Sequence, residues 1–125
     1  MDMRTLLATV GLLVFGAGKS NAEETVKVYR EDIAAGRQSS DFYMIRAFIT
    51  GLGEGMIWAN AQSTNNKVPL FCAGHLPLHF ENYTDILDRE IKKLSTVESE
   101  EKLAQTPIGL VLLLGLQETF PCDAK

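Results

Sequence analysis

The N-terminal segment constrains the fold most, because its pattern predicts that it is removed before the chain folds. Arg4 precedes an uncharged stretch, residues 5–18, that is rich in Leu, Val and Ala. Ser20 and Ala22 then place small side chains at the −3 and −1 positions of a signal-peptidase site. The apolar stretch has about 14 residues, fewer than the roughly 20 that a membrane-spanning helix needs. We therefore expect residues 1–22 to be a cleaved secretory signal peptide, with an uncleaved N-terminal anchor as the alternative.

Cleavage would leave one small acidic domain, residues 23–125. Of the 125 residues, 103 remain, which is the size of a single domain. The removed segment carries two cations and one anion, so the net charge changes from −4 to −5. An acidic domain without a basic stripe argues against nucleic acid or an anionic membrane as a partner.

Cys72 and Cys122 are the only two cysteines of the chain. In an exported protein two cysteines usually pair, so a Cys72–Cys122 disulfide is expected. Such a bridge would close a loop of about 50 residues and contribute about 4 kcal/mol on the chain-entropy estimate. Two free thiols or a metal-binding pair are the alternatives.

Helical spacing of apolar residues and the absence of any hairpin signal predict an all-α fold, a small compact bundle of about four helices. Capping residues are expected at Ser39 or Ser40, at Asn82 and at Thr106, which Pro107 follows. The expected helices cover residues 24–35, 41–62, 83–94 and 107–119, with a further helical turn around 98–103.

Two of these segments have unusual compositions. Residues 41–62 contain Gly51, Gly53 and Gly55, and each glycine costs roughly 1 kcal/mol in a helix interior. Because Gly51 and Gly55 share one face, we expect another helix to approach there, with an interruption near Gly53 as the alternative. Residues 108–119 are apolar nearly all round, which predicts a central helix or one at an oligomer interface and is compatible with a homodimer.

No arrangement of residues indicates catalysis, a cofactor or a metal. Cys72, His75 and His79 have a spacing that superficially resembles a metal set, but Pro77 intervenes and Cys72 has a better partner in Cys122. No serine lies in a Gly-x-Ser-x-Gly setting, and there is no phosphate-binding glycine loop. Glu54, a charge among the glycines, is more simply a salt-bridge partner of Arg46 or of another segment than a general base. The protein is therefore expected not to be an enzyme.

Several short motifs follow one another in an order that resembles a known family. They are Phe48-Ile49-Thr50-Gly51 in a helix, Phe71-Cys72 followed by Leu76-Pro77, the helix at 83–94, and a last apolar helix that ends in Phe120-Pro121-Cys122. This order resembles the Rap/Tai immunity proteins, over roughly residues 41–122. One departure is Met44, where that family often has a further cysteine; without it, two cysteines remain for one bridge.

The resemblance implies a small all-α periplasmic protein that neutralises a peptidoglycan amidase toxin delivered by type VI secretion. Inhibition would work by occlusion, as a rigid helical body presents a loop or helix edge to the amidase cleft. Proteins of that family are also often homodimers. The residues of this chain offer a protruding polar loop at 59–68 as the candidate contact, although a plain solvated connector is an equally good interpretation. The candidate partner-binding residues are Gln62, Ser63, Thr64, Asn65, Asn66 and Lys67.

Two other hypotheses remain open at this point. One is a periplasmic helical stress protein or chaperone of the same general build, with no toxin partner. A chaperone that acid releases should carry carboxylates at a dimer interface, whereas the last helix here has only Glu118 near its end. The other is an enzyme, which a catalytic dyad in a cleft would support.

Overall fold

Five helices form the part of the chain that the computed structural model describes, residues 24–62 and 68–123. The predicted signal peptide, residues 1–22, lies outside the described residues. The helices are α1 (Val26–Ala34), α2 (Ser40–Gln62), α3 (Phe80–Leu94), α4 (Glu100–Ala104) and α5 (Ile108–Thr119). No strand is present in these residues, so the all-α prediction is confirmed.

Local capping explains most of the helix boundaries. The Ser39 hydroxyl accepts a hydrogen bond from the Phe42 backbone N–H (3.1 Å), which confirms Ser39 as the cap of α2. Gly36 ends the preceding segment with a φ of 92°, a conformation that favours glycine. α5 begins at Ile108, directly after Pro107, one residue later than the predicted start.

The predicted start of α3 was wrong by three residues. The helix begins at Phe80, not after an Asn82 cap, and His79 precedes it in extended conformation. The Asn82 side-chain oxygen instead reaches back and accepts a hydrogen bond from the His79 backbone N–H (2.8 Å). Asn82 therefore does stabilise the helix end, but from inside its first turn.

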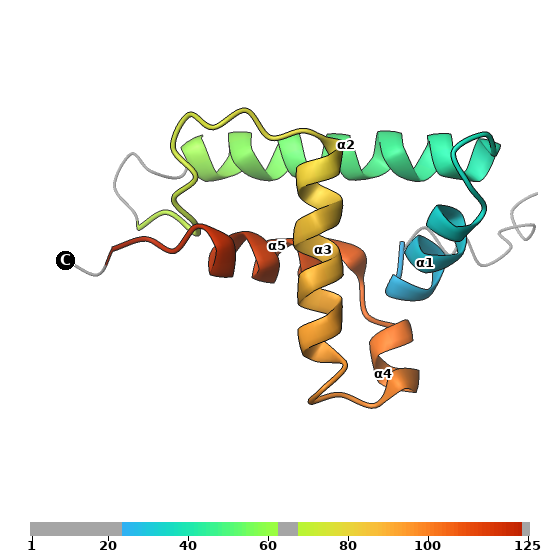
Figure 1. Ribbon diagram of the computed structural model, residues 1–125. Helices are drawn as coiled ribbons and strands as arrows, with labels where there is room; N and C mark the ends of the chain where they lie inside the picture. The colour runs from blue at the N-terminus through green and yellow to red at the C-terminus, as the bar shows by residue number, and fades with distance from the viewer. Residues whose placement is uncertain (1–23, 63–67, 124–125) are drawn as a thin grey trace, which may run out of the picture.

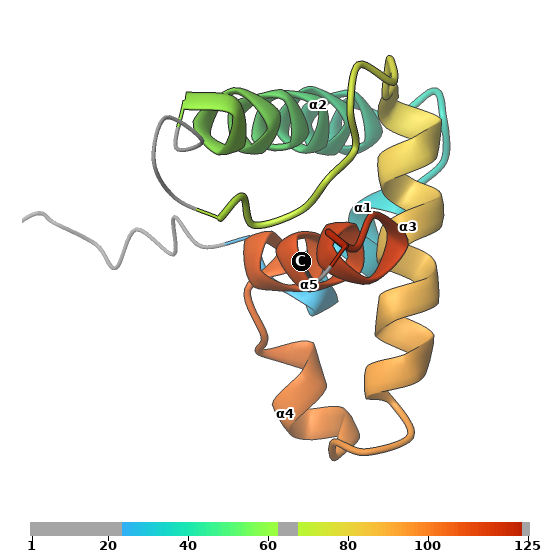
Figure 2. The same ribbon diagram turned by 90° about the vertical axis from the view of Figure 1, so that its left-hand side faces the viewer.

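Three helices that cross one another organise the molecule. α2 lies above α5, and both run towards the same side in Figure 1, but Figure 2 shows that their axes diverge; α3 crosses both (Figures 1 and 2). α1 and α4 lie together near the start of α5. The backbone joins these ends, since the Val26 N–H donates to the Thr106 C=O (2.9 Å) and the Ile108 N–H donates to the Glu24 C=O (2.8 Å).

α5 lies at the centre of the fold, which is one of the two placements that its apolar composition predicted. Four of its side chains are fully buried, and Gly115 lets α3 approach closely, because a Cβ there would lie 2.5 Å from Cγ2 of Ile86. The surrounding core takes apolar residues from every helix. Its fully buried large side chains are Val26, Ile45, Ile49, Phe71, Tyr83, Leu87, Leu103, Ile108, Val111, Leu112 and Leu116.

The glycines of α2 correct another prediction. The helix continues without interruption to Gln62, and the close approach is at Gly53 rather than at Gly51 and Gly55. A Cβ on Gly53 would lie 2.3 Å from Cζ of Tyr83, so only glycine leaves room for that ring. At Gly51 and Gly55 a Cβ would meet nothing within 4 Å. The predicted contact face is therefore open in this structure.

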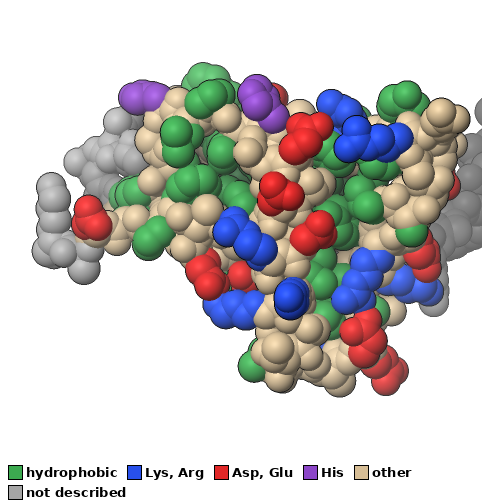
Figure 3. Space-filling model, viewed as in Figure 1, with side chains coloured by type: hydrophobic (Ala, Val, Ile, Leu, Met, Phe, Trp, Pro, Cys, Tyr) green, Lys and Arg blue, Asp and Glu red, His purple; other side chains and the backbone are tan. Residues whose placement is uncertain are grey.

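Charged and apolar side chains occupy different parts of the surface. Acidic and basic side chains gather over α3 and the region below it, whereas hydrophobic side chains gather where α2 ends and residues 68–79 cross (Figure 3). Among the described residues, no helix is long and apolar enough to cross a membrane.

Candidate functional site

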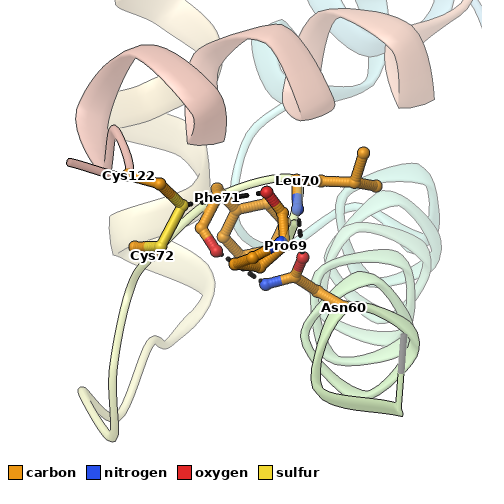
Figure 4. Close-up of a disulfide and its surroundings, with 6 residues drawn as sticks. All are labelled: Asn60, Pro69, Leu70, Phe71, Cys72 and Cys122. Atoms are coloured by element: carbon orange, nitrogen blue, oxygen red, sulfur yellow. Dashed lines mark hydrogen bonds between the residues drawn. A yellow bond between two sulfur atoms is a disulfide. The ribbon is translucent and has the colours of Figure 1, made fainter. Parts of the chain in front are cut away.

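The disulfide joins the two cysteine-containing motifs at one end of the molecule. Cys72 and Cys122 are bonded with a Cα–Cα distance of 5.0 Å, which confirms the predicted bridge (Figure 4). The Cys72 backbone N–H also donates to the Phe120 C=O (2.8 Å). Residues 71–72 and 120–122 are therefore held together covalently and through the backbone, although some 50 residues separate them in the chain.

Asn60 fastens the same region to α2. Its amide nitrogen donates to the Phe71 C=O (2.7 Å), and its amide oxygen accepts from the Leu70 N–H (2.7 Å; Figure 4). Both partners lie beyond the polar loop, so one side chain ties the chain before that loop to the chain after it. The sequence does not predict this role, because an asparagine near the end of a helix does not indicate which distant backbone groups it contacts.

We call the two hydrogen bonds of Asn60, to Leu70 and Phe71, the Asn60 clamp. In the sequence the candidate binding residues lie between the two sides of this clamp. Gln62 is the last residue of α2 and is exposed, and the flanking Val68 is exposed as well. The remaining candidates, Ser63, Thr64, Asn65, Asn66 and Lys67, lie outside the described residues. The structure describes the chain on the two sides of this loop, which Asn60, Phe71 and the disulfide hold in place. We call these two sides the base of the loop.

A shallow pocket of about 290 Å³ lies at this base. Ile57 and Ala61 of α2 form one wall, and Pro69, Phe71 and Ala73 are among the residues of the other. The pocket is mostly apolar and contains no ionisable side chain. It offers shape and apolar surface rather than acid–base or nucleophilic chemistry.

The residues considered for a metal or a nucleophile do not form a site. His75 and His79 are both exposed, and the Cys72 sulfur is consumed by the disulfide. Within the described residues no three His, Cys, Asp or Glu side chains come together in a way that would hold a metal ion.

The predicted pairing of Glu54 with Arg46 is not what the structure shows. The Arg46 guanidinium lies 4.0 Å from the Glu81 carboxylate and 5.2 Å from the centre of the Phe80 ring, on α3. Glu54 is exposed and lies about two turns further along α2. Arg46 thus ties α2 to the start of α3 instead of stabilising α2 alone.

A second pocket, about 420 Å³, lies between α3 and α5 and contains the one buried charged residue among those described. Only 7% of the Glu90 surface is exposed. Burial raises the pKa of the Glu90 carboxyl, Lys93 opposes that rise, and the Glu118 carboxylate adds to it. Lys93 donates a hydrogen bond to Glu118, which lowers the pKa of Glu118.

Tyr29 and Asp88 form a further polar contact, between α1 and α3. The Tyr29 hydroxyl donates to the Asp88 carboxylate (2.8 Å). Burial, and then this hydrogen bond, raises the pKa of Tyr29 far above its ordinary value, so the phenol stays protonated. Neither Tyr29 nor Glu90 lies beside a nucleophile, and both belong to helix–helix contacts.

Comparison of the chain with protein-family models, with curated proteins and with solved structures finds no match.

Proposed function

We propose that this protein is a periplasmic inhibitor that gives immunity against a type VI-delivered peptidoglycan amidase by binding the toxin and occluding its cleft. The observation that supports this proposal most is the junction at Cys72–Cys122. It brings together Phe71-Cys72 and Phe120-Pro121-Cys122, two of the motifs that carry the resemblance to Rap/Tai immunity proteins, at the base of the candidate loop.

The mechanical requirement for occlusion is a contact segment that starts from a fixed base. Asn60 and the disulfide fix the chain on the two sides of residues 62–67. A loop with fixed ends loses less conformational freedom on binding than one with free ends, so more of the contact energy appears as affinity. The apolar pocket beside it would accept a side chain from the rim of an amidase cleft.

Export is part of the same proposal. A cleaved signal peptide at residues 1–22 would deliver the domain to the compartment that contains peptidoglycan, and a disulfide persists in such an oxidising compartment. No side chain of the protein needs to react, because occlusion blocks the enzyme by position alone.

The proposal is tested by binding and by protection. Bacteria that express the protein should survive periplasmic delivery of the cognate amidase, and the amidase should be recovered with the protein from periplasmic extract. Replacing residues 62–67 by a Gly-Ser segment of equal length should abolish both effects and leave the melting temperature unchanged, because the clamp lies outside the replaced segment. A matched control, Glu100→Gln with Glu101→Gln on α4, should keep both effects.

The competing candidate is a helical stress chaperone, which could use the exposed apolar side chains of Met44 and Trp58 on α2 to bind unfolded clients. Such a protein would suppress aggregation of unfolded clients, most strongly in acid, and would not discriminate among amidases. Aggregation suppression without amidase protection would contradict the immunity proposal.

A further inference from the structure

A groove of about 530 Å³ lies along α3, beside the end of α5, and the proposed function does not use it. Its volume is within the range of roughly 300–1,000 Å³ that is usual for ligand sites. We call it the α3 groove. The residues that line it include Leu78, Asp85, Ile86, Asp88, Arg89 and Phe120.

The α3 groove has an apolar surface that is fixed in position. Leu78, Ile86 and Phe120 contribute this surface. The Phe120 C=O accepts a hydrogen bond from the Cys72 N–H (2.8 Å), beside the disulfide, so the backbone of Phe120 is held in place. The hydrocarbon stem of a long polar side chain can lie against such a surface.

Asp85 and Asp88 bring two carboxylates to the groove, one helical turn apart on α3. The Tyr29 hydroxyl donates to Oδ1 of Asp88 (2.8 Å), which orients that side chain and leaves its second oxygen for another donor. Among the described residues, no Lys, Arg or His nitrogen lies within 4.0 Å of either carboxylate. Both carboxylates are therefore available to a cation from outside the domain.

The other acidic residues of α3 differ in this respect. Glu81 lies 4.0 Å from the Arg46 guanidinium, and Lys93 interacts electrostatically with Glu90. The acidic side chains of α3 that lack a cation are thus those of the groove.

Arg89, the cation of the groove, does not neutralise these carboxylates directly. Its guanidinium donates to the Thr119 hydroxyl (3.3 Å) and to the backbone C=O of Asp85 (3.4 Å), and it interacts electrostatically with Glu118. With two carboxylates and one guanidinium, the groove has a net charge of −1. Figure 3 shows the same mixture, with acidic and basic side chains over α3 and hydrophobic side chains beside them.

We infer that the α3 groove binds a lysine or arginine side chain of a partner protein. In this arrangement the hydrocarbon stem lies against Leu78 and Phe120, and the charged group reaches Asp85 and the second oxygen of Asp88. Carboxylates and an aromatic ring both attract a cation. An acidic side chain would meet like charge there, and an uncharged one would leave both carboxylates without a partner.

The charge of the whole chain favours the same class of partner. A net charge of −4 attracts basic surfaces and speeds their encounter with the protein. The inference does not rest on the proposed function, because any protein that presents a basic side chain of sufficient reach would fit.

The test is an NMR titration of the purified, disulfide-bonded protein with short peptides. Acetyl-Gly-Arg-Gly-amide and acetyl-Gly-Lys-Gly-amide should each shift the backbone amide signals of Asp85, Arg89 and Phe120 in a saturable way. A single side chain held by exposed charges should bind with a dissociation constant of about 1–10 mM.

Two further peptides separate the contributions of charge and stem. Norleucine in place of lysine keeps the stem without the charge, and 2,3-diaminopropionic acid keeps the charge on a shorter stem. Each should bind at least about threefold more weakly than the lysine peptide. Equal binding of the norleucine peptide would show that charge has no role, and equal binding of the diaminopropionic acid peptide would show that the apolar surface has none. Either result would overturn the inference.

Three variants locate the site. Asp85→Asn should weaken binding of the arginine peptide about threefold, because one of two carboxylates is lost. Asp85→Lys should abolish binding, because it places a cation in the groove. Glu101→Gln, which removes an exposed carboxylate of α4, is the matched control and should leave the dissociation constant unchanged. Equal effects of Asp85→Asn and Glu101→Gln, saturable shifts confined to another surface, or no saturable shift up to about 50 mM peptide would overturn the inference.

Discussion

Single residues decide how closely the helices of this protein approach. Tyr83 is fully buried with its ring against the backbone of Gly53, and Ile86 lies against Gly115 in the same way. α3 therefore uses one glycine of α2 and one of α5 to pack against both helices. The geometry leaves no room for even one additional carbon atom at either glycine.

Gly53→Ala should destabilise the fold by roughly 1–3 kcal/mol, the usual cost of overpacking a core. The Tyr83 ring would have to move, and it is enclosed on all sides. Gly51→Ala, two residues away on the open face, is the control and should stabilise the helix by up to about 1 kcal/mol at dilution. Urea denaturation measures both; a stabilising Gly53→Ala would contradict the observed packing.

Glu90 should make stability depend on pH in the direction opposite to most carboxylates. Its folded pKa lies above the ordinary value of 4.5, so in the window just above pH 4.5 the folded state binds more protons than the unfolded state. The free energy of unfolding should therefore fall as pH rises through that window. Glu90→Gln should be more stable than the native protein at pH 7, and the difference should vanish below pH 4.5.

Glu118 is the matched control for Glu90, because Lys93 lowers the pKa of Glu118. Its contribution to stability is present at neutral pH and is lost as pH falls through the lowered pKa. Glu118→Gln should consequently lose stability at pH 7. Thermal unfolding from pH 3 to pH 8 distinguishes the two, and the same sign for both variants would refute this assignment.

At the scale of helices and loops, covalent and polar ties hold the ends of α2 and α5. The disulfide, the Cys72–Phe120 backbone hydrogen bond and the two hydrogen bonds of Asn60 lie within one short stretch. At the opposite end of α5 there is no disulfide in the described residues, and the backbone pairing of Thr25 with Pro107 holds this end in place. α5 is thus fixed at both of its ends.

Reducing the disulfide should lower the melting temperature by roughly 15 °C or more. Closing a loop of 50 residues contributes about 4 kcal/mol on the chain-entropy estimate, and a domain of this size loses several degrees for each kcal/mol. Calorimetry with and without reductant measures the change. The double variant Cys72→Ser with Cys122→Ser should show no response to reductant; no effect of reductant on the native protein would contradict a stabilising bridge.

The sequence predicted those elements whose signals are local. Ser39 caps α2 because its hydroxyl is close in sequence to the Phe42 N–H, and the Cys72–Cys122 bridge followed from there being only two cysteines. It did not predict which glycine of α2 faces another helix, because that depends on where α3 crosses. The sequence did not predict the hydrogen bonds of Asn60 for a similar reason, since their partners lie ten and eleven residues further along, in an irregular segment.

At the scale of the whole molecule, two surfaces have different chemistry. The end held by Asn60 and the disulfide has an apolar pocket and is proposed to contact an amidase, whereas the outer side of α2 exposes Met44 and Trp58 to solvent. Nothing in the described residues resembles a catalytic arrangement. Under the proposed function, specificity would depend on residues 62–67, and rigidity would depend on the disulfide.

The most direct test of the central claim is protection from lysis by the cognate amidase when the protein is supplied in the periplasm. Cells with the native protein or with the α4 control should survive, and cells in which residues 62–67 are replaced while folding is retained should lyse. Lysis with the native protein, although it is folded and located in the periplasm beside every candidate amidase, would contradict the proposed function.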